Sequence, residues 1–163
     1  MAFRGVTVHS GNPDNVRSSD IGAFQAAAIG TEAYILSGCV ATMPNANTVS
    51  ITAGYLLAHG RLVAVTPSNL TIENGNQGQM RADLVCLQYD YDPSTEVEAF
   101  SGVVIKGVPG TTAIDPGYED ASILDNPPLA QIPLWRVTLN GISPTVARIA
   151  SGPPSVYSTT ETM

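Results

Sequence analysis

Few side chains of this sequence have the types and spacing that enzymes and metal sites use. The two histidines, His9 and His59, each stand beside turn residues, and neither has a second histidine or a carboxylate at metal-ligand spacing. The sequence contains no GxSxG turn of the serine hydrolases, no P-loop, and no GxGxxG after a predicted strand. We therefore expect no catalytic, cofactor-binding or metal-ligating residue.

Acidic residues, whose carboxylate oxygens can bind a cation, gather in two stretches. The first, "YDYDPSTEVE", and the second, "DPGYEDASILD", hold these carboxylates: Asp90, Asp92, Glu96, Glu98, Asp115, Glu119, Asp120 and Asp125. Oxygen-rich turns can hold calcium, but a solvated hairpin tip explains the first stretch more simply. Nothing in either stretch sets two carboxylates at the separation that a glycosidase requires.

The two cysteines show neither a zinc pattern nor a disulfide framework. Cys39 and Cys86 are far apart and have no CxxC or histidine-rich neighbourhood. Cys86 lies in the apolar run "DLVCLQY" and is predicted to be a small buried side chain. The first 15 residues, "MAFRGVTVHSGNPDN", lack an apolar core of signal-peptide length, so we expect synthesis in a cytoplasm and two free thiols.

Charge is scarce in this chain. Charged residues make up 13% of its 163 residues, about half of the ~25% typical of soluble domains. Such a deficit is expected where surface is buried in an assembly. The net charge is −7 and the few basic residues are scattered, which argues against nucleic-acid binding. No apolar run reaches the roughly 18 residues of a membrane span, and we expect no membrane partner.

The sequence predicts one short helix at about residues 19–29, "SSDIGAFQAAAIG". Ser18 or Ser19 can cap it, and Gly30 is placed to end it in a left-handed conformation. Ile21 and Phe24 share one face, through which we expect the helix to dock.

From Tyr34 onward, short candidate strands alternate with turn sequences. The candidates are "YIL", "CVATM", "TVSITA", "GYLLA", "RLVAV", "NLTIE", "ADLVCLQYDY", "VEAFSGVVIKG", "AQIPLWRVTLN" and "PTVARIA". This pattern predicts an all-β fold, an antiparallel β-sandwich or barrel-like domain over residues 18–150. Residues 1–17 are predicted to be an extended arm, and residues 151–163 a flexible or exchanged tail.

The strand "RADLVCLQYDY" is predicted to be central, because apolar residues occupy both of its faces. Arg81 and Asp83 lie two residues apart on one face and can pair with one another or with a neighbouring residue. "DPST" is a turn sequence that should join this strand to the next as a hairpin. Trp135, the only tryptophan, is predicted to lie in the core rather than to stack on a ligand.

The stretch "ITAGYLLAHGRLVAV", residues 51–65, is apolar on both faces of a predicted hairpin. One face can cover the core, and the other then needs a partner. We place Leu56, Leu62 and Ala64 on the side opposite Val63 and Val65. The candidate oligomer interface is Tyr55, Leu56, Leu62 and Ala64. A register shift of one residue would exchange the two sides.

The order of these segments resembles the amino-terminal domains of bacteriophage baseplate and tail-fibre proteins, such as siphophage baseplate upper proteins. The matching features are Ala53-Gly54 before Gly60-Arg61, the strand from Arg81 to Asp90, and the strand from Pro128 to Val137. The resemblance covers roughly residues 18–140. It implies a non-enzymatic virion structural protein, a homo-oligomer and most commonly a trimer, that contacts other virion proteins after assembly in the host cytoplasm.

Three classes of function remain after these observations. The first is the virion protein, either an oligomeric baseplate, tail or fibre-attachment subunit or a head decoration or head-fibre protein. The second is a carbohydrate-binding module for a host surface glycan, with Tyr118, Tyr157 and Trp135 as candidate stacking residues. The third is a hydrolase with an unrecognised site, which we favour least.

Overall fold

The structure is a computed structural model that describes residues 16–154 of the chain. Its regular elements are α1 (Ser18–Ile29), β1 (Ala33–Gly38), β2 (Ala41–Asn45), β3 (Thr48–Ile51), β4 (Gly54–Ala58), β5 (Arg61–Val65), β6 (Ser68–Thr71), β7 (Met80–Asp92), β8 (Val97–Ile105), the short 3-10 helix η1 (Ile123–Asp125), β9 (Leu129–Asn140) and β10 (Ser143–Arg148). Each of the ten candidate strands of the sequence corresponds to one observed strand. The all-β fold with one short amino-terminal helix is confirmed.

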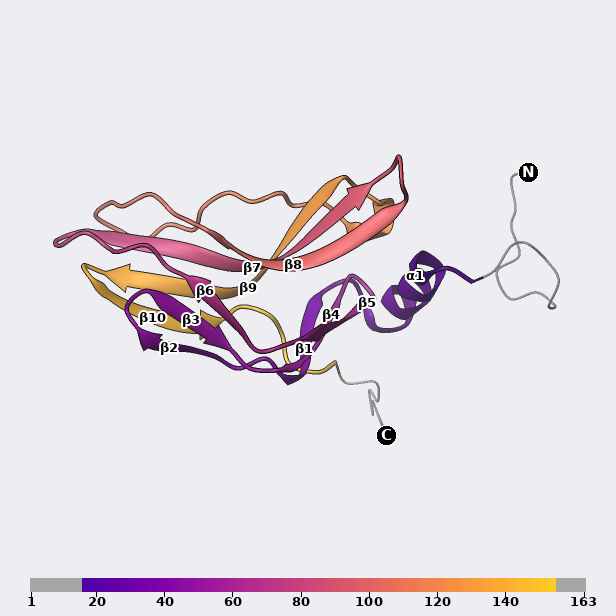
Figure 1. Ribbon diagram of the computed structural model, residues 1–163, viewed down its shortest axis with the longest axis horizontal. Helices are drawn as coiled ribbons and strands as arrows, with labels where there is room; N and C mark the ends of the chain where they lie inside the picture. The colour runs from indigo at the N-terminus through magenta and orange to yellow at the C-terminus, as the bar shows by residue number, and fades with distance from the viewer. Residues whose placement is uncertain (1–15, 155–163) are drawn as a thin grey trace, which may run out of the picture.

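The strands form two layers of antiparallel sheet (Figure 1). One layer is a four-stranded sheet in the order β10-β9-β7-β8. The other consists of two three-stranded sheets, β1-β4-β5 and β2-β3-β6, which lie end to end. The four-stranded sheet curls, so that its edge strand β10 contacts β2 of the opposite layer. The arrangement is a sandwich that is partly closed along one side.

The two small sheets together form one layer. Each of the three long strands of this layer is interrupted at the same position along its length. β1 continues into β2, β3 into β4, and β5 into β6, with only two residues between each pair. Gly38 has a φ of 58°, and a Cβ there would lie 2.0 Å from the carbonyl oxygen of Ala53. Between β5 and β6, Pro67 has no N–H to donate to a hydrogen bond with a neighbouring strand. These residues interrupt the layer and allow its two halves to follow the curled sheet.

β7 is the central strand of the molecule, as predicted. It pairs with β8 along nine residues and with β9 along most of its length. Val85, Leu87 and Tyr89 enter the core, while Leu84 and Cys86 are buried on the opposite face. The β7–β8 hairpin turns at the predicted "DPST" sequence.

The core lies between the two layers and draws on nearly every strand. Its largest members include Tyr89 and Trp135, and the exposed fraction of Trp135 is 4%, which confirms the core prediction. Both cysteines are buried free thiols, and burial raises the pKa of Cys86 to about 12. A thiol with so high a pKa is unreactive at neutral pH.

An irregular connection, residues 106–128, runs along the outer side of the four-stranded sheet (Figure 1). Gly110 forms a bridge with Met80, and the N–H of Glu119 donates to Oε1 of Gln131 at 3.0 Å. Arg136 on β9 forms an ion pair with Asp115. These contacts hold the long connection, which includes the short helix η1, against the sheet.

The carboxyl-terminal end of the domain is hydrogen-bonded to β1. Ser151, where the tail was predicted to begin, forms a bridge with Tyr34, and its N–H donates to the carbonyl of Ala33 at 3.1 Å. Residues 155–163, together with nearly all of the predicted arm at residues 1–17, lie outside the described residues.

The helix lies at residues 18–29, close to the predicted bounds, but two details of the prediction were wrong. Its N-cap is Arg17 rather than a serine, and the N–H of Arg17 donates to the carboxylate of Asp20 at 2.9 Å. Gly30 ends the helix with a φ of 95° and a ψ of 173°, a positive φ as expected but outside the left-handed helical region.

The docking face of the helix was also predicted wrongly. Phe24 and Ile21 are 76% and 50% exposed, and the buried residues are Gly22 and Ala26. Gly60, at the β4–β5 turn, has a φ of 78°, and a Cβ there would lie 2.0 Å from the carbonyl oxygen of Gly22. The helix backbone therefore approaches this turn too closely for large side chains. Ile21 and Phe24 do share one face of the helix, but that face points away from the domain.

We expect Gly60→Ala to destabilise the domain by about 2 kcal/mol or more, because the positive φ and the close approach of α1 both exclude a Cβ. Phe24→Ala should change the free energy of unfolding by less than about 0.5 kcal/mol, as an exposed site does. Urea unfolding followed by circular dichroism measures both. Gly117→Ala, where a Cβ meets nothing within 4 Å, is the matched control. A large cost for Phe24→Ala would contradict the observed docking.

Candidate functional site

The outer face of the β4–β5 hairpin is the first candidate site, because the sequence analysis placed an interface there. The antiparallel register pairs Leu56 with Val63, Tyr55 with Ala64, and Leu57 with Leu62. Leu56 and Val63 consequently face the core, and Leu56 is buried. The prediction that Leu56 shares a row with Leu62 and Ala64 is wrong, since the antiparallel register places it opposite Val63.

The other three predicted interface residues do share the outer face of this sheet. Tyr55 and Leu62 are 50% and 57% exposed, and Ala64 is exposed beside them. Val63 and Val65 pack partly buried against the core, as predicted for the opposite side. An apolar row of this kind, held rigidly on a sheet, is suited to contact with another protein surface.

The hairpin is held in place by a partly buried ion pair that the sequence analysis did not identify. Arg61 donates from both terminal nitrogens to the Glu98 carboxylate, at 3.0 Å and 2.6 Å. Glu98 also accepts from the hydroxyl of Tyr89 at 2.9 Å and from that of Ser18 at 3.3 Å. One carboxylate thus joins α1, β5, β7 and β8. No local sequence signal could have found this contact, because Arg61 and Glu98 are 37 residues apart.

The electrostatics of this cluster depend on its burial. The exposed fraction of the Arg61 side chain is 8% and that of Glu98 is 22%. The hydrogen bonds from Arg61 lower the pKa of Glu98 below its usual range. Burial, followed by the hydrogen bond to Glu98, raises the pKa of Tyr89, so its phenol stays protonated and acts as a donor. Nε of Arg61 is buried without a hydrogen-bond partner beneath Gly22.

Two more carboxylates of "YDYDPSTEVE", those of Asp90 and Asp92, have structural partners. Asp92 accepts from the N–H and hydroxyl of Ser94, at 2.8 Å and 2.6 Å, and so shapes the hairpin turn. Asp90 accepts from the amide of Gln88 at 3.1 Å. Across residues 16–154, no three His, Cys, Asp or Glu side chains gather as a metal site would require.

The predicted pair of Arg81 and Asp83 is confirmed as a second buried ion pair. Arg81 donates to the two oxygens of Asp83 at 2.8 Å and 2.9 Å, and also to the carbonyls of Glu73 and Asn74. Asp83 in addition accepts from the N–H of Gly107 at 2.9 Å. Every contact is internal to the fold, so this pair joins loops to β7 and is not a binding site.

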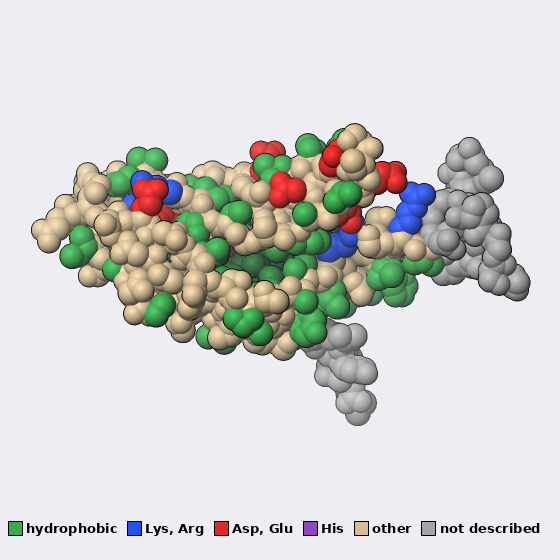
Figure 2. Space-filling model, in the orientation of Figure 1, with side chains coloured by type: hydrophobic (Ala, Val, Ile, Leu, Met, Phe, Trp, Pro, Cys, Tyr) green, Lys and Arg blue, Asp and Glu red, His purple; other side chains and the backbone are tan. Residues whose placement is uncertain are grey.

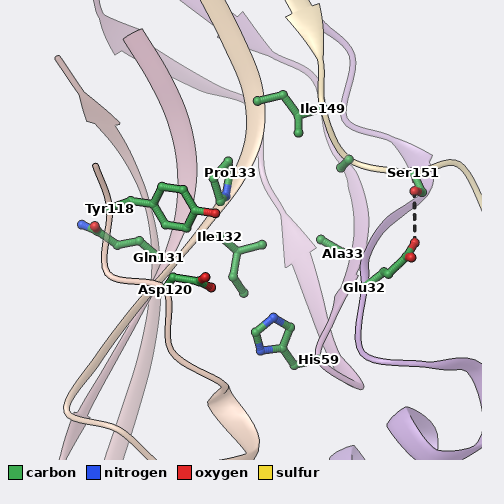
Figure 3. A pocket seen from close by; sticks show the side chains of 11 residues that line it. Glu32, Ala33, His59, Tyr118, Asp120, Gln131, Ile132, Pro133, Ile149 and Ser151 are labelled. Atoms are coloured by element: carbon green, nitrogen blue, oxygen red, sulfur yellow. Dashed lines mark hydrogen bonds between the residues drawn. The ribbon is translucent and has the colours of Figure 1, made fainter. Parts of the chain in front are cut away.

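A hollow of about 310 Å³, lined by both polar and apolar residues, lies near the β4–β5 turn (Figure 3). Apolar residues such as Ile132 and Ile149 form part of its wall, and its polar side chains come from separate parts of the chain: Glu32, His59, Tyr118, Asp120, Gln131 and Ser151. Figure 3 shows the ring of His59 and the carboxylate of Asp120 facing this space. Ser151 donates to Glu32 at 3.4 Å along its rim.

His59 is positioned by the turn that holds it. Its φ is 48°, and its Nδ1 accepts from the N–H of Ile123 at 3.1 Å. The neutral ring therefore carries its proton on Nε2. Burial lowers the pKa of His59, while the nearby Asp120 opposes that shift. With Nδ1 engaged by the backbone, this histidine serves as a structural acceptor and as a donor toward the hollow, not as a base for a hydroxyl.

The residues proposed for glycan stacking are separated by the fold. Tyr118 is 40% exposed and lines the hollow, whereas Trp135 is buried and Tyr157 lies beyond the described residues.

No helix in the described part of the chain is long and apolar enough to cross a membrane.

Comparison with known proteins does not assign the chain to a family. No protein-family model matches the sequence, and no curated protein matches it significantly.

Replacing Glu98 by Gln should destabilise the domain by about 3 kcal/mol at neutral pH, because it leaves the buried Arg61 charge uncompensated. The folded-state pKa of Glu98 is lowered, so its contribution is present above the unfolded value of about 4.3 and is lost as pH falls through the folded pKa. The difference in unfolding free energy between parent and variant should therefore shrink between about pH 6 and pH 3. Urea titrations across that range measure it, and a difference independent of pH would contradict the role assigned to the carboxylate.

Proposed function

We propose that this protein is a non-enzymatic structural subunit of a bacteriophage virion, assembled in the host cytoplasm as a homo-oligomer. The observation that carries the proposal is the exposed apolar row of Tyr55, Leu62 and Ala64 on a rigid sheet face. The scarcity of charge, at 13% of residues, supports it, as does the resemblance to phage baseplate and tail-fibre domains. Within the class, a baseplate, tail or fibre-attachment subunit is favoured over a head decoration protein by that resemblance alone.

The geometry favours contact between copies through this row. Its strands are held from beneath by the core and from one end by the Arg61–Glu98 ion pair, so the face is formed before any partner binds. Preorganised apolar surface lowers the entropic cost of association. A trimer is the stoichiometry that the resemblance implies. Other virion proteins are the partners of the assembled subunit.

Leu62→Glu should give folded protein that no longer assembles, because it places a charge in the middle of the apolar row. Size-exclusion chromatography with light scattering measures the oligomeric state, and circular dichroism checks folding. Val108→Glu is the matched control, since Val108 is 81% exposed on the 106–128 connection. Val63→Glu should instead destabilise the fold, because Val63 packs against the core. Normal assembly of the Leu62 variant would refute the interface.

A second candidate function, recognition of a host surface glycan, is favoured by the hollow near the β4–β5 turn. An exposed aromatic ring at Tyr118 stands there beside Asp120 and Glu32, whose oxygens can accept hydrogen bonds from sugar hydroxyls. Aromatic residues make up only 6% of the chain, which is why this function ranks second.

If the hollow binds glycans, Tyr118→Ala should reduce binding on a glycan array at least tenfold. Ile114→Ala, at an exposed position of the same connection, should leave it unchanged. An array on which the parent protein binds no glycan would remove this candidate.

A further inference from the structure

An apolar groove of about 500 Å³ opens into the core between the two layers of the sandwich. Figure 2 shows it as a recess of hydrophobic side chains at the middle of the molecule. Its floor includes Leu56, Val85, Leu87 and Trp135, all core residues. None of the side chains that line it is charged.

Three sheet edges border this groove. Among the strands of residues 16–154, β5 pairs only with β4, β8 only with β7, and β6 only with β3. Residues 63–66 of β5 and its end, 68–70 of β6 and 100–102 of β8 line the opening. Unpaired strand edges beside an apolar slot are the two features that proteins use to accept an extended segment, through backbone hydrogen bonds and side-chain pockets respectively.

We propose that the groove is a strand-acceptor site for residues 5–8, "GVTV", of a neighbouring copy of this chain. In an extended conformation Val6 and Val8 point to one side and can enter the groove, while Thr7 points away. Residues 5–8 carry no charge, which matches the uncharged lining. The inference rests on the proposed homo-oligomer.

The size of the proposed interface explains why a second contact is needed. Tyr55, Leu62 and Ala64 together present far less than the roughly 800 Å² per partner that a stable interface buries. A strand inserted into the groove adds apolar burial and backbone hydrogen bonds. Both surfaces lie on β5, one on its outer face and one at its edge, so copies that meet at the face bring an arm close to the neighbouring groove.

The reach of the arm is sufficient. Fifteen residues precede Val16, and an extended chain of that length spans up to about 50 Å. The helix that follows is attached to its own domain at Ser18 through Glu98 and at Gly22 through the β4–β5 turn. The helix from which residues 1–15 extend is thus fixed to its own domain, and a chain of that length in extended form is long enough to enter the groove of a neighbouring copy.

Gly102 provides a variant that blocks the groove without disturbing the fold. It lies on β8 at the opening, and a Cβ there would meet only Leu70, at 3.6 to 4.0 Å, an ordinary contact distance. Gly102→Val should fold normally and fill the slot. Gly117→Val, where a Cβ meets nothing within 4 Å, is the matched control.

The experiment compares four proteins by size-exclusion chromatography with light scattering: the parent, Gly102→Val, Gly117→Val and a chain lacking residues 2–15. We expect the parent and the Gly117 variant to assemble, and the other two to need at least tenfold higher concentration to do so. Mixing the arm-deleted chain with Gly102→Val should restore a complex, because one supplies an open groove and the other an arm.

A synthetic peptide of residues 1–15 gives a direct readout that does not depend on the Gly102 variant. Trp135, the only tryptophan, lines the groove, so saturable binding of the peptide to the arm-deleted chain should change its fluorescence. Assembly of the arm-deleted chain at the parent's concentration, or a peptide that leaves the fluorescence unchanged, would overturn the inference. If Leu62→Glu abolishes assembly while the chain lacking residues 2–15 and Gly102→Val both assemble as the parent does, the proposed function stands and only the strand exchange fails.

Discussion

The Arg61–Glu98 ion pair is the contact on which the placement of the β4–β5 hairpin depends. Arg61 follows the turn directly, and its guanidinium reaches across to β8, where Glu98 also accepts from Tyr89 and Ser18. A buried charge is tolerated only where a partner compensates it. The cluster therefore fixes the position of the small sheet and the helix relative to the four-stranded sheet through one carboxylate.

The placement of the hairpin decides which of its side chains are exposed. With the hairpin set against the core through Leu56 and Val63, the alternation of the strands leaves Tyr55, Leu62 and Ala64 outward. The same β5 strand ends the small sheet, so its free edge borders the apolar groove. The proposed self-association rests on these two features of one strand, an exposed apolar face and an edge that borders the groove.

Several acidic residues that could have been ligands for a cation form hydrogen bonds within the fold instead. The "YDYDPSTEVE" stretch has the oxygen content of a calcium loop, yet Asp92 accepts hydrogen bonds from its own turn and Glu98 is held by Arg61. The hydrogen-bonding capacity of these carboxylates is thus largely engaged within the chain. His59 is similar, since its acceptor nitrogen is used by the backbone of Ile123.

The sequence by itself determined the strands, the helix, the β7–β8 hairpin and the Arg81–Asp83 pair. Each of these depends on residues a few positions apart, through side-chain alternation, turn residues or a two-residue spacing. The tertiary structure alone decided that Leu56 faces the core, that α1 docks through Gly22 and Ala26, and that Glu98 joins four elements. These outcomes depend on strand register and on partners distant in sequence, because a one-residue shift exchanges the faces of a strand. A helix with two apolar stripes can dock by either, and here the close approach at Gly60 admits only the stripe of small residues.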